Sequence, residues 1–565
     1  MKLIKLELHD DFRSLKKGFV INFTNDESSK FNPYCLVGLN GSGKSNILEI
    51  LATIFYQLDL ICLGFQPEIF EEYDTSETKP NSYLLEYFIG ENRVRVVKEV
   101  GKRVNVYLKD DTPLSKVDIK KVLPEHIVAY SSGGNETLSL PFLKTKFIQY
   151  DEYHNSLIKK YPYSSPESRL VYLDSTFSQS IFLCNFLFQP DDILEIFDDV
   201  LGIKKTKRFS IVINKSHFEL LSEEHLKSTK LELFQHIEKI QKNIENYLEE
   251  EDVETSDENS IRETLLNCLS NIESRDTQIE LTTNLESEID KLVRCSTLHY
   301  EDKEKELLYL DFYVDDVLKD AFRLHFGDAF GLFKLFQILI VLNSYHIKQE
   351  VKNDIYRKDS LYAKGKIFQL PWSERIFRFK DFWVEKDDSV ILSKSLSDGE
   401  HQFLHSIGLA LLYKNTSSLF LLDEPETHFN PKWRANYIST LHKCFKDDTV
   451  FPEILITSHS PFIISDLEKE NVLVFEKNKE NNVVECHRPD FNTFGASVGE
   501  ITEVLFNQTK SMGDSASEEL EKTIDNIKTL EDYKKAKIKL NNFGESIEKF
   551  DILNKLNKMK RKMNL

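Results

Sequence analysis

The chain has 565 residues, of which 41% are hydrophobic and 12% aromatic, so it can bury two or more cores and is not a disordered chain. Its 73 basic and 93 acidic residues give a formal charge of −20, which disfavours non-specific binding to nucleic acids and anionic membranes. The longest apolar run, residues 330–342, is too short to cross a bilayer and no targeting signal is visible, so we expect a cytoplasmic protein without membrane contact.

Residues 1–137 are predicted to form a strand-rich N-terminal lobe. Alternating apolar residues indicate strands at 3–8 and 19–23, and a short apolar run at 34–37 indicates a buried strand. Further strand patterns follow at 83–88, 93–98 and 104–108, separated by turn residues. We therefore expect a β-rich flank around the first motif.

That motif, GLNGSGKS, matches the phosphate-binding pattern G-x-x-x-x-G-K-[ST]. It follows a predicted buried strand and precedes apolar residues at helical spacing, which is the context that the pattern requires. Backbone N–H groups of such a loop bind phosphate, Lys44 would bind the β- and γ-phosphates of ATP, and Ser45 would ligate Mg²⁺. The predicted nucleotide-binding residues of this motif are Gly38, Asn40, Gly41, Ser42, Gly43, Lys44, Ser45 and Asn46.

Residues 138–374 are predicted to form a mostly α-helical insertion that contacts partners or other copies of the chain. An acidic low-complexity stretch at 249–260 is predicted to be a solvated loop. The heptad pattern is too short for the long coiled-coil arm of a chromosome-organising ATPase. The insertion ends where strand signals return at residue 375.

The segment 375–510, a predicted C-terminal lobe, begins with an unusual helix start at KSLSDGEHQFL. Its Ser397, Asp398, Gly399 and Glu400 form an S-x-x-E capping box, and a capped helix N-terminus beside glycine can bind an anion. Because GLNGSGKS already encloses the phosphates of its own chain, we predict that this second site covers the γ-phosphate held by another copy. ATP would then be shared between two copies at a two-fold interface. An ordinary helix cap is the alternative interpretation.

The same lobe supplies candidate catalytic residues. SLFLLDE is an apolar strand that ends in two carboxylates, of which Asp423 is a candidate Mg²⁺ ligand and Glu424 a candidate for polarising the attacking water. The next buried strand, EILIT, is followed by His459, a candidate sensor of the γ-phosphate. Each of these patterns is common in isolation. Their occurrence together with GLNGSGKS is what favours a catalytic role.

The last segment, residues 511–565, is predicted to be a helical tail with a basic end, which a solvated surface explains without further function. The seven cysteines form no CxxC pair and are expected to be reduced thiols of a cytosolic protein.

Taken in order, GLNGSGKS, LSDGE, FLLDEPETH and ITSHSP resemble the motifs of the ABC-type ATPase heads of the RecF, SMC and Rad50 superfamily. The resemblance covers roughly residues 1–140 and 375–510. It implies an α/β fold, namely a P-loop NTPase head with a mixed sheet and a β-rich flank, interrupted by the helical insertion. It also implies that PETHFNP is a D-loop and that Arg13, in HDDFRSL, contacts the nucleotide. The glutamine loop of that superfamily has no glutamine in VAYSSGGNE, and Gln149 is only a weak substitute.

A closer resemblance is to the PtuA ATPase subunits of Septu-type and retron-linked bacterial anti-phage systems, carried by LPEHIVAYSSGGNE, SLSDGEHQFLHSIGLALL, LDEPETHFNP and TFGASVGEITEVLF. It implies a slowly hydrolysing ATPase that forms ATP-clamped dimers and higher oligomers and gates a separate HNH nuclease. In the retron form, a reverse transcriptase and its RNA-linked single-stranded DNA (msDNA) are further partners. Residues 466–565 contain no D-x-D of a fused Toprim nuclease, so we predict no intrinsic nuclease activity.

Two other functions fit the motifs. A RecF-like ATPase that clamps DNA in repair or recombination would need a basic face, for which RVRVVKEVGKRV and the tail are the candidates. A transporter cassette fits less well, because the segment between GLNGSGKS and LSDGE is over twice the length that a compact cassette needs.

Overall fold

The computed structural model describes the chain except for residues 24–30, 68–77, 109–111, 133–135, 160–165, 167, 173–174, 216–282, 358–366, 368–369, 447, 449, 479–482, 509–511, 525–526, 528 and 563–565. The acidic stretch 249–260 lies outside the described residues.

An antiparallel five-stranded sheet forms the N-terminal flank, in the order β2-β1-β4-β5-β6. It confirms the strands predicted from alternating apolar residues, with ends that differ by one or two positions. Its strands are β1 (Lys2–Leu8), β2 (Val20–Asn22), β4 (Tyr83–Ile89), β5 (Asn92–Lys98) and β6 (Asn105–Tyr107).

The central sheet has seven strands in the order β17-β16-β3-β15-β14-β7-β8, all paired in parallel except β16 with β17. Parallel pairing brings the carboxyl ends of β3, β15 and β14 to one edge, where sheets of this kind bind ligands. Its strands are β3 (Tyr34–Val37), β7 (Ile127–Ser131), β8 (Leu170–Tyr172), β14 (Leu419–Asp423), β15 (Glu453–Thr457), β16 (Val472–Lys477) and β17 (Val484–His487).

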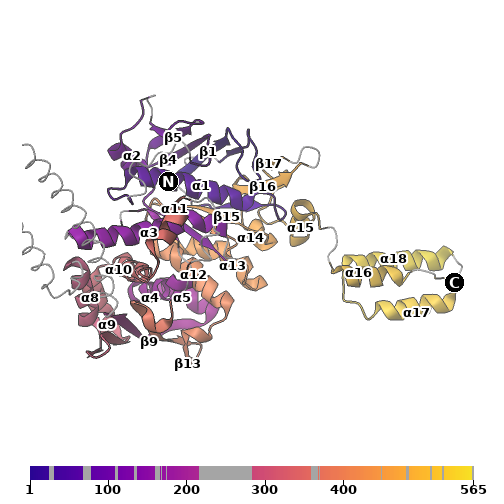
Figure 1. Ribbon diagram of the computed structural model, residues 1–565. Coiled ribbons are helices and arrows are strands. Elements are labelled where there is room, and N and C mark those ends of the chain that lie inside the picture. Colours follow the sequence, from indigo (N-terminus) through magenta and orange to yellow (C-terminus); the bar gives the residue numbers. More distant parts are fainter. Residues whose placement is uncertain are drawn as a thin grey trace, which may run out of the picture.

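Both faces of the central sheet are buried, against different cores. In β14, Leu419 and Leu421 pack with helix α1 (Lys44–Cys62) and the N-terminal flank, whereas Phe420 and Leu422 face the core on the other side. Figure 1 shows α1 between the flank strands β1, β4 and β5 and the rest of the molecule. By length and composition α1 is apolar enough to cross a membrane, but it is mostly buried inside the fold. Helices α9 (Asp316–Phe326) and α10 (Ala329–Leu342), which are bent by 77° relative to each other, pass the same test only if they are taken together as one span.

The predicted insertion contains strands as well as helices. Strands β9 (Ile203–Asn214), β10 (Leu298–Asp302) and β11 (Leu307–Tyr313) pair with β12 (Phe377–Lys386) and β13 (Ser389–Leu392) in a third sheet, ordered β10-β11-β9-β12-β13. This sheet crosses the expected boundary at residues 374 and 375, and β8 joins the central sheet. The insertion helices are α3 (Glu136–Lys159), α4 (Ser178–Phe188), α5 (Asp191–Leu201), α8 (Thr283–Cys295), α9 (Asp316–Phe326), α10 (Ala329–Leu342) and α11 (Gln349–Arg357).

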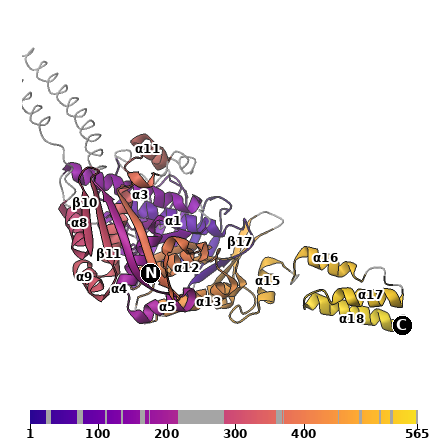
Figure 2. The same cartoon turned by 90° about the horizontal axis from the view of Figure 1, so that it is seen from below.

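The remaining helices complete the head and form a C-terminal bundle. The bundle helices have a small apolar core of their own, which includes Leu520, Leu540 and Leu556, and Figure 2 shows them beyond α15 at the far end from α8 and α9. The head helices are α2 (Lys116–Val122), α12 (Asp398–Leu412), α13 (Pro431–Cys444), α14 (Pro461–Ser465) and α15 (Val498–Phe506), and the bundle helices are α16 (Asp514–Lys522), α17 (Leu530–Leu540) and α18 (Ile547–Lys562).

Candidate nucleotide site

The loop GLNGSGKS connects β3 to α1 at the carboxyl edge of the central sheet. Gly38 has φ of +146°, and a Cβ there would lie 2.3 Å from the carbonyl oxygen of Phe475, so no other residue fits. The ammonium of Lys44 donates to the carbonyl oxygens of Gly38 at 2.9 Å and Leu39 at 3.2 Å, which holds it inside the loop. Burial lowers the Lys44 pKa, and the nearby carboxylates of Glu424 and Asp423 oppose that shift.

This loop fits a phosphate. The hydroxyl oxygen of Ser42 is buried and has no hydrogen-bond partner in the described part of the chain. A buried polar atom without a partner is unfavourable unless a ligand supplies one. Together with the Lys44 ammonium at the start of α1, it forms a site suited to the polyphosphate of a nucleotide.

Side chains of the N-terminal turn support the start of α1. Arg13 donates to the Glu49 carboxylate at 2.7 and 3.1 Å, and Asn46 donates to the Ser14 hydroxyl at 2.7 Å. The structure therefore places Arg13 and Asn46 at the first turns of this helix. Direct contact of either residue with a nucleotide stays a prediction.

The two predicted metal ligands lie in contact. The Ser45 hydroxyl donates to Asp423 Oδ1 at 2.9 Å, and the Thr457 hydroxyl donates to the same oxygen at 2.7 Å. Asp423 ends β14 and is aligned with Thr457, which ends β15. Hard oxygen ligands suit Mg²⁺, which usually binds one or two protein oxygens together with phosphates. The described residues accordingly contain no group of three or more His, Cys, Asp or Glu side chains that could hold a metal alone.

The two predicted catalytic residues also meet at this edge. Glu424 adopts a left-handed backbone, with φ of +48°, and its N–H donates to the hydroxyl of Thr457 at 3.0 Å. This conformation turns the Glu424 carboxylate toward His459, whose Nε2 lies 3.6 Å from Oε1. Burial lowers the His459 pKa and the nearby Lys44 lowers it further, whereas the carboxylates of Glu424 and Asp423 oppose the shift.

With ATP and Mg²⁺ bound, the metal would neutralise charge on the β- and γ-phosphates. Ser45 and Asp423 are the residues that would hold it. Glu424 is half exposed at the sheet edge and can accept a proton from water, while the His459 imidazole can form a hydrogen bond beside it.

Sequence inspection did not single out Glu426, which joins two of the loops at this edge. Its side chain is 4% exposed, and the Ser458 hydroxyl donates to Oε1. Burial raises the Glu426 pKa to about 7. This contact ties the loop after β14 to the loop that carries His459. Glu426 lies within PETHFNP, but the motif does not reveal that its carboxylate is buried, because burial depends on the surrounding fold.

The predicted capping box at the start of α12 is confirmed. Ser397 caps the helix by accepting from the Glu400 N–H at 3.4 Å, and the Glu400 carboxylate accepts from the Ser397 N–H at 2.7 Å. A Cβ on Gly399 would lie 2.6 Å from the carbonyl oxygen of His428, and the His428 N–H donates to Gln402 at 2.9 Å. The first turn of α12 is therefore fitted closely against PETHFNP.

Ser397 and Asp398 are both exposed. In the described residues, no hydrogen bond or ion pair joins positions 397–400 to the phosphate loop at 38–46. The two predicted anion sites of one chain therefore do not bond to each other within the described residues.

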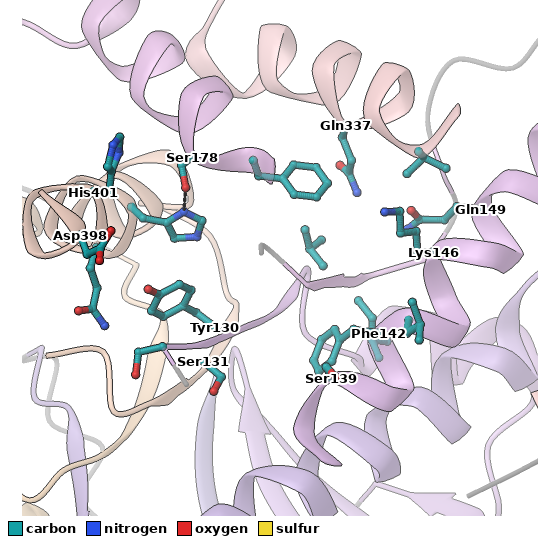
Figure 3. Close-up of a pocket in the computed structure, with 18 of the residues that line it drawn as sticks. Tyr130, Ser131, Ser139, Phe142, Lys146, Gln149, Ser178, Gln337, Asp398 and His401 are labelled. Atoms are coloured by element: carbon teal, nitrogen blue, oxygen red, sulfur yellow. Dashed lines mark hydrogen bonds between the residues drawn. The ribbon is translucent and has the colours of Figure 1, made fainter. Parts of the chain in front are cut away.

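The segment expected in place of a glutamine loop starts at the end of β7. Ser132 donates from its N–H to the Asp423 carbonyl at 3.3 Å, and its hydroxyl lies 2.9 Å from that of Thr427. Residues 133–135 lie outside the described part. Gln149 belongs to α3 and lines a separate cavity (Figure 3).

A family model of the AAA ATPase domain matches residues 1–464. The chain belongs to this family. The match includes the insertion, which the motif resemblance did not cover. Ser45 and Asp423, which are in contact, both lie within the matched residues.

Two curated proteins show weaker similarity. Protein ea59 of Escherichia phage lambda is 28% identical over 111 residues, and the retron Ec83 probable ATPase of Escherichia coli is 27% identical over 111 residues. These matches cover 20% and 18% of this chain, and 20% of each relative. The chain thus matches about a fifth of the length of either protein.

Solved structures with similarity include an SMC head domain from Thermotoga maritima and the recombination mediator protein RecF. The SMC head is 10% identical, with 87% of this chain and 100% of that chain covered and a TM-score of 0.32. RecF is 15% identical, with 86% and 97% covered and a TM-score of 0.27. The α/β head architecture itself is seen directly in the mixed central sheet, the β-rich flank and the phosphate loop of this chain.

Proposed function

We propose that this chain binds ATP, hydrolyses it slowly, and controls a separate nuclease in a bacterial anti-phage defence complex. The proposal has three parts, which rest on different observations: the nucleotide site, the closure of that site by a second copy, and the nuclease partner.

The observation that carries the ATPase part is the contact of Ser45 with Asp423. These residues are 378 positions apart in the sequence, and the fold brings their oxygens to 2.9 Å beside the ammonium of Lys44. A hydroxyl and a carboxylate next to a phosphate loop are the oxygens that Mg²⁺–ATP requires. The chain also provides Glu424 and His459 at the same edge for hydrolysis.

The dimer part follows from the exposed start of α12. A capped helix N-terminus with Gly399 beside it can bind an anion, and it makes no bond to the phosphate loop of its own chain in the described residues. We infer that two copies meet head to tail, and that Ser397 of each covers the γ-phosphate held by the other. ATP then favours association because it binds the paired state.

The nuclease part rests on sequence resemblance to PtuA-type subunits and on the short similarity to a retron ATPase. By that resemblance, the partner is an HNH nuclease in the cytoplasm, and the retron form adds a reverse transcriptase with its msDNA. Slow hydrolysis suits gating, because the complex then changes state only when ATP is lost or infection disturbs the assembly. DNA clamping in repair is the alternative, and the charge of −20 disfavours it.

The test is to express the tagged chain with the HNH reading frame encoded beside its gene. We expect the nuclease to copurify with the wild-type chain and to be inactive in the presence of ATP. Lys44→Ala, which removes the phosphate-binding ammonium, should release that inhibition, whereas Lys348→Ala, at an exposed position remote from the site, should not. Absence of an HNH frame, or nuclease activity that ignores Lys44→Ala, would contradict the proposal.

A further inference from the structure

A cavity of about 480 Å³ lies beside α12, and no residue of the phosphate loop lines it. Residues of β7, β8, α3, α4, α10 and the first turns of α12 line it, and Figure 3 shows most of them. Small-molecule sites typically have volumes of about 300–1,000 Å³. None of the residues predicted from the phosphate loop or from the metal site lines this cavity.

One end of the cavity carries positive charge and hydrogen-bond donors that lack partners. Lys146 is partly buried and forms no hydrogen bond or ion pair with the described residues. Gln149 is 3% exposed, and its amide nitrogen is buried without a hydrogen-bond partner in the described part of the chain. Gln337, on α10, lies at the same end, and Figure 3 shows Lys146 and Gln149 side by side. A buried donor without a partner is unfavourable unless a ligand supplies an acceptor, and the neighbouring Lys146 ammonium favours an anionic one.

The middle of the cavity is aromatic. Tyr130 and His405 have ring centroids 4.7 Å apart, and Phe142 and Phe177 also line the cavity. The Ser178 hydroxyl lies 2.8 Å from His405 Nδ1 and fixes that ring. Such surfaces stack against planar rings.

The other end of the cavity lies at the first turns of α12. Asp398 and His401 line it there, on the side opposite Lys146 in Figure 3. His428, whose carbonyl meets Gly399, lines the same end. A molecule in the cavity would therefore contact the helix start that we propose covers ATP in the partner copy.

We propose that this cavity binds a nucleoside monophosphate, with the phosphate at Lys146 and Gln149 and the base between the aromatic side chains. The ligand class follows from the combination of an anion site, a planar apolar middle and a volume that suits one nucleotide. Occupancy would set the position of the first turn of α12 and so couple a small metabolite to closure of the ATP site. The binding step itself does not depend on the proposed function.

The test uses the full chain carrying Lys44→Ala, which removes nucleotide binding at the phosphate loop. The common ribonucleoside and deoxyribonucleoside 5′-monophosphates are added singly, with the matching nucleosides and inorganic phosphate as controls. Thermal unfolding identifies binding and titration calorimetry gives the Kd. We expect at least one monophosphate to raise the melting temperature, with the nucleosides and phosphate weaker.

Lys146→Met in the same background should weaken that Kd by at least about tenfold, which is the effect of losing one hydrogen bond to a charged group. Lys348→Met, at an exposed lysine outside the cavity, should leave it unchanged. Without ligand, Lys146→Met should melt no lower than its parent, because it removes an unpaired cation. The proposal is wrong if no monophosphate raises the melting temperature, or if the shift survives Lys146→Met. Measuring ATP binding to a Lys146→Met chain that retains Lys44 tests the phosphate-loop site separately from the cavity.

Discussion

Replacing Gly399 with alanine tests whether the close fit of α12 against PETHFNP matters for pairing of two copies. The added Cβ would lie 2.6 Å from the carbonyl oxygen of His428 and 3.3 Å from a ring carbon of Trp433, so the helix start or the loop must move. Overpacking of this kind costs about 1–3 kcal/mol. Alanine recovers about 0.5–1 kcal/mol in a helix relative to glycine. The net loss of stability is therefore about 0–2.5 kcal/mol.

The assay has two readouts. Thermal unfolding of Gly399→Ala should show a melting temperature lower by a few degrees, since about 1 kcal/mol shifts a large domain by roughly 2–4 °C. In a Glu424→Gln background, ATP-driven association should weaken while ATP binding by the single chain stays near wild type, because Gly399 makes no bond to the phosphate loop. Gly544→Ala is the matched control, since a Cβ there meets no atom within 4 Å. Unchanged association of Gly399→Ala would refute the reasoning.

Three further changes test the site. Asp423→Asn removes the negative charge that Ser45 and Thr457 contact, so Mg²⁺-dependent ATP binding should weaken about ten- to a hundredfold in calorimetry, and binding measured with EDTA should not change. Ser397→Arg should block association in light scattering and leave the ATP affinity of the single chain nearly intact, and the reverse result would contradict the composite site. Glu426 has a folded-state pKa of about 7 against its ordinary 4.5, so the fold disfavours its charged form and stability falls as pH rises from 4.5 to 7. Glu426→Gln should remove up to about 3 kcal/mol of that fall, measured by denaturant unfolding at pH 5 and 8. An unaltered pH dependence would show that Glu426 is not buried as a neutral acid.

The nucleotide site was largely predictable because its signals are local. SLFLLDE joins a continuous apolar strand to two carboxylates, and the carboxyl end of a buried parallel strand is the edge at which such side chains lie. The capping box at Ser397 needs only four residues, so it too could be predicted, and the structure confirms it. Tertiary context was needed to see that Ser45 and Asp423 are in contact.

The strands that the insertion contributes to the third sheet were missed, although part of their signal is present, whereas β12 and β13 lie where strand signals were predicted from residue 375. LLYLDFY at β11 alternates, with Leu308, Leu310 and Phe312 buried, but it lies among helical patterns, which favoured a helical insertion. Pairing of β9 with β12 joins residues more than 160 positions apart, and no local pattern specifies such a partner.

The cavity and Glu426 could not be predicted. Lys146, Ser178, Gln337 and His401 come from four helices that are distant in the sequence, and only their packing places them around one space. The raised pKa of Glu426 depends on burial by neighbours rather than on the PETHFNP motif.

The central claim is that each ATP is enclosed by two copies of the chain. Light scattering of Glu424→Gln, which should bind ATP without hydrolysing it, tests this most directly. With Mg²⁺–ATP we expect a mass of at least twice the 66.0 kDa of one chain, and with no nucleotide or with Ser397→Arg added we expect 66.0 kDa. A Glu424→Gln chain that is saturated with ATP and still has the mass of one copy would contradict the account.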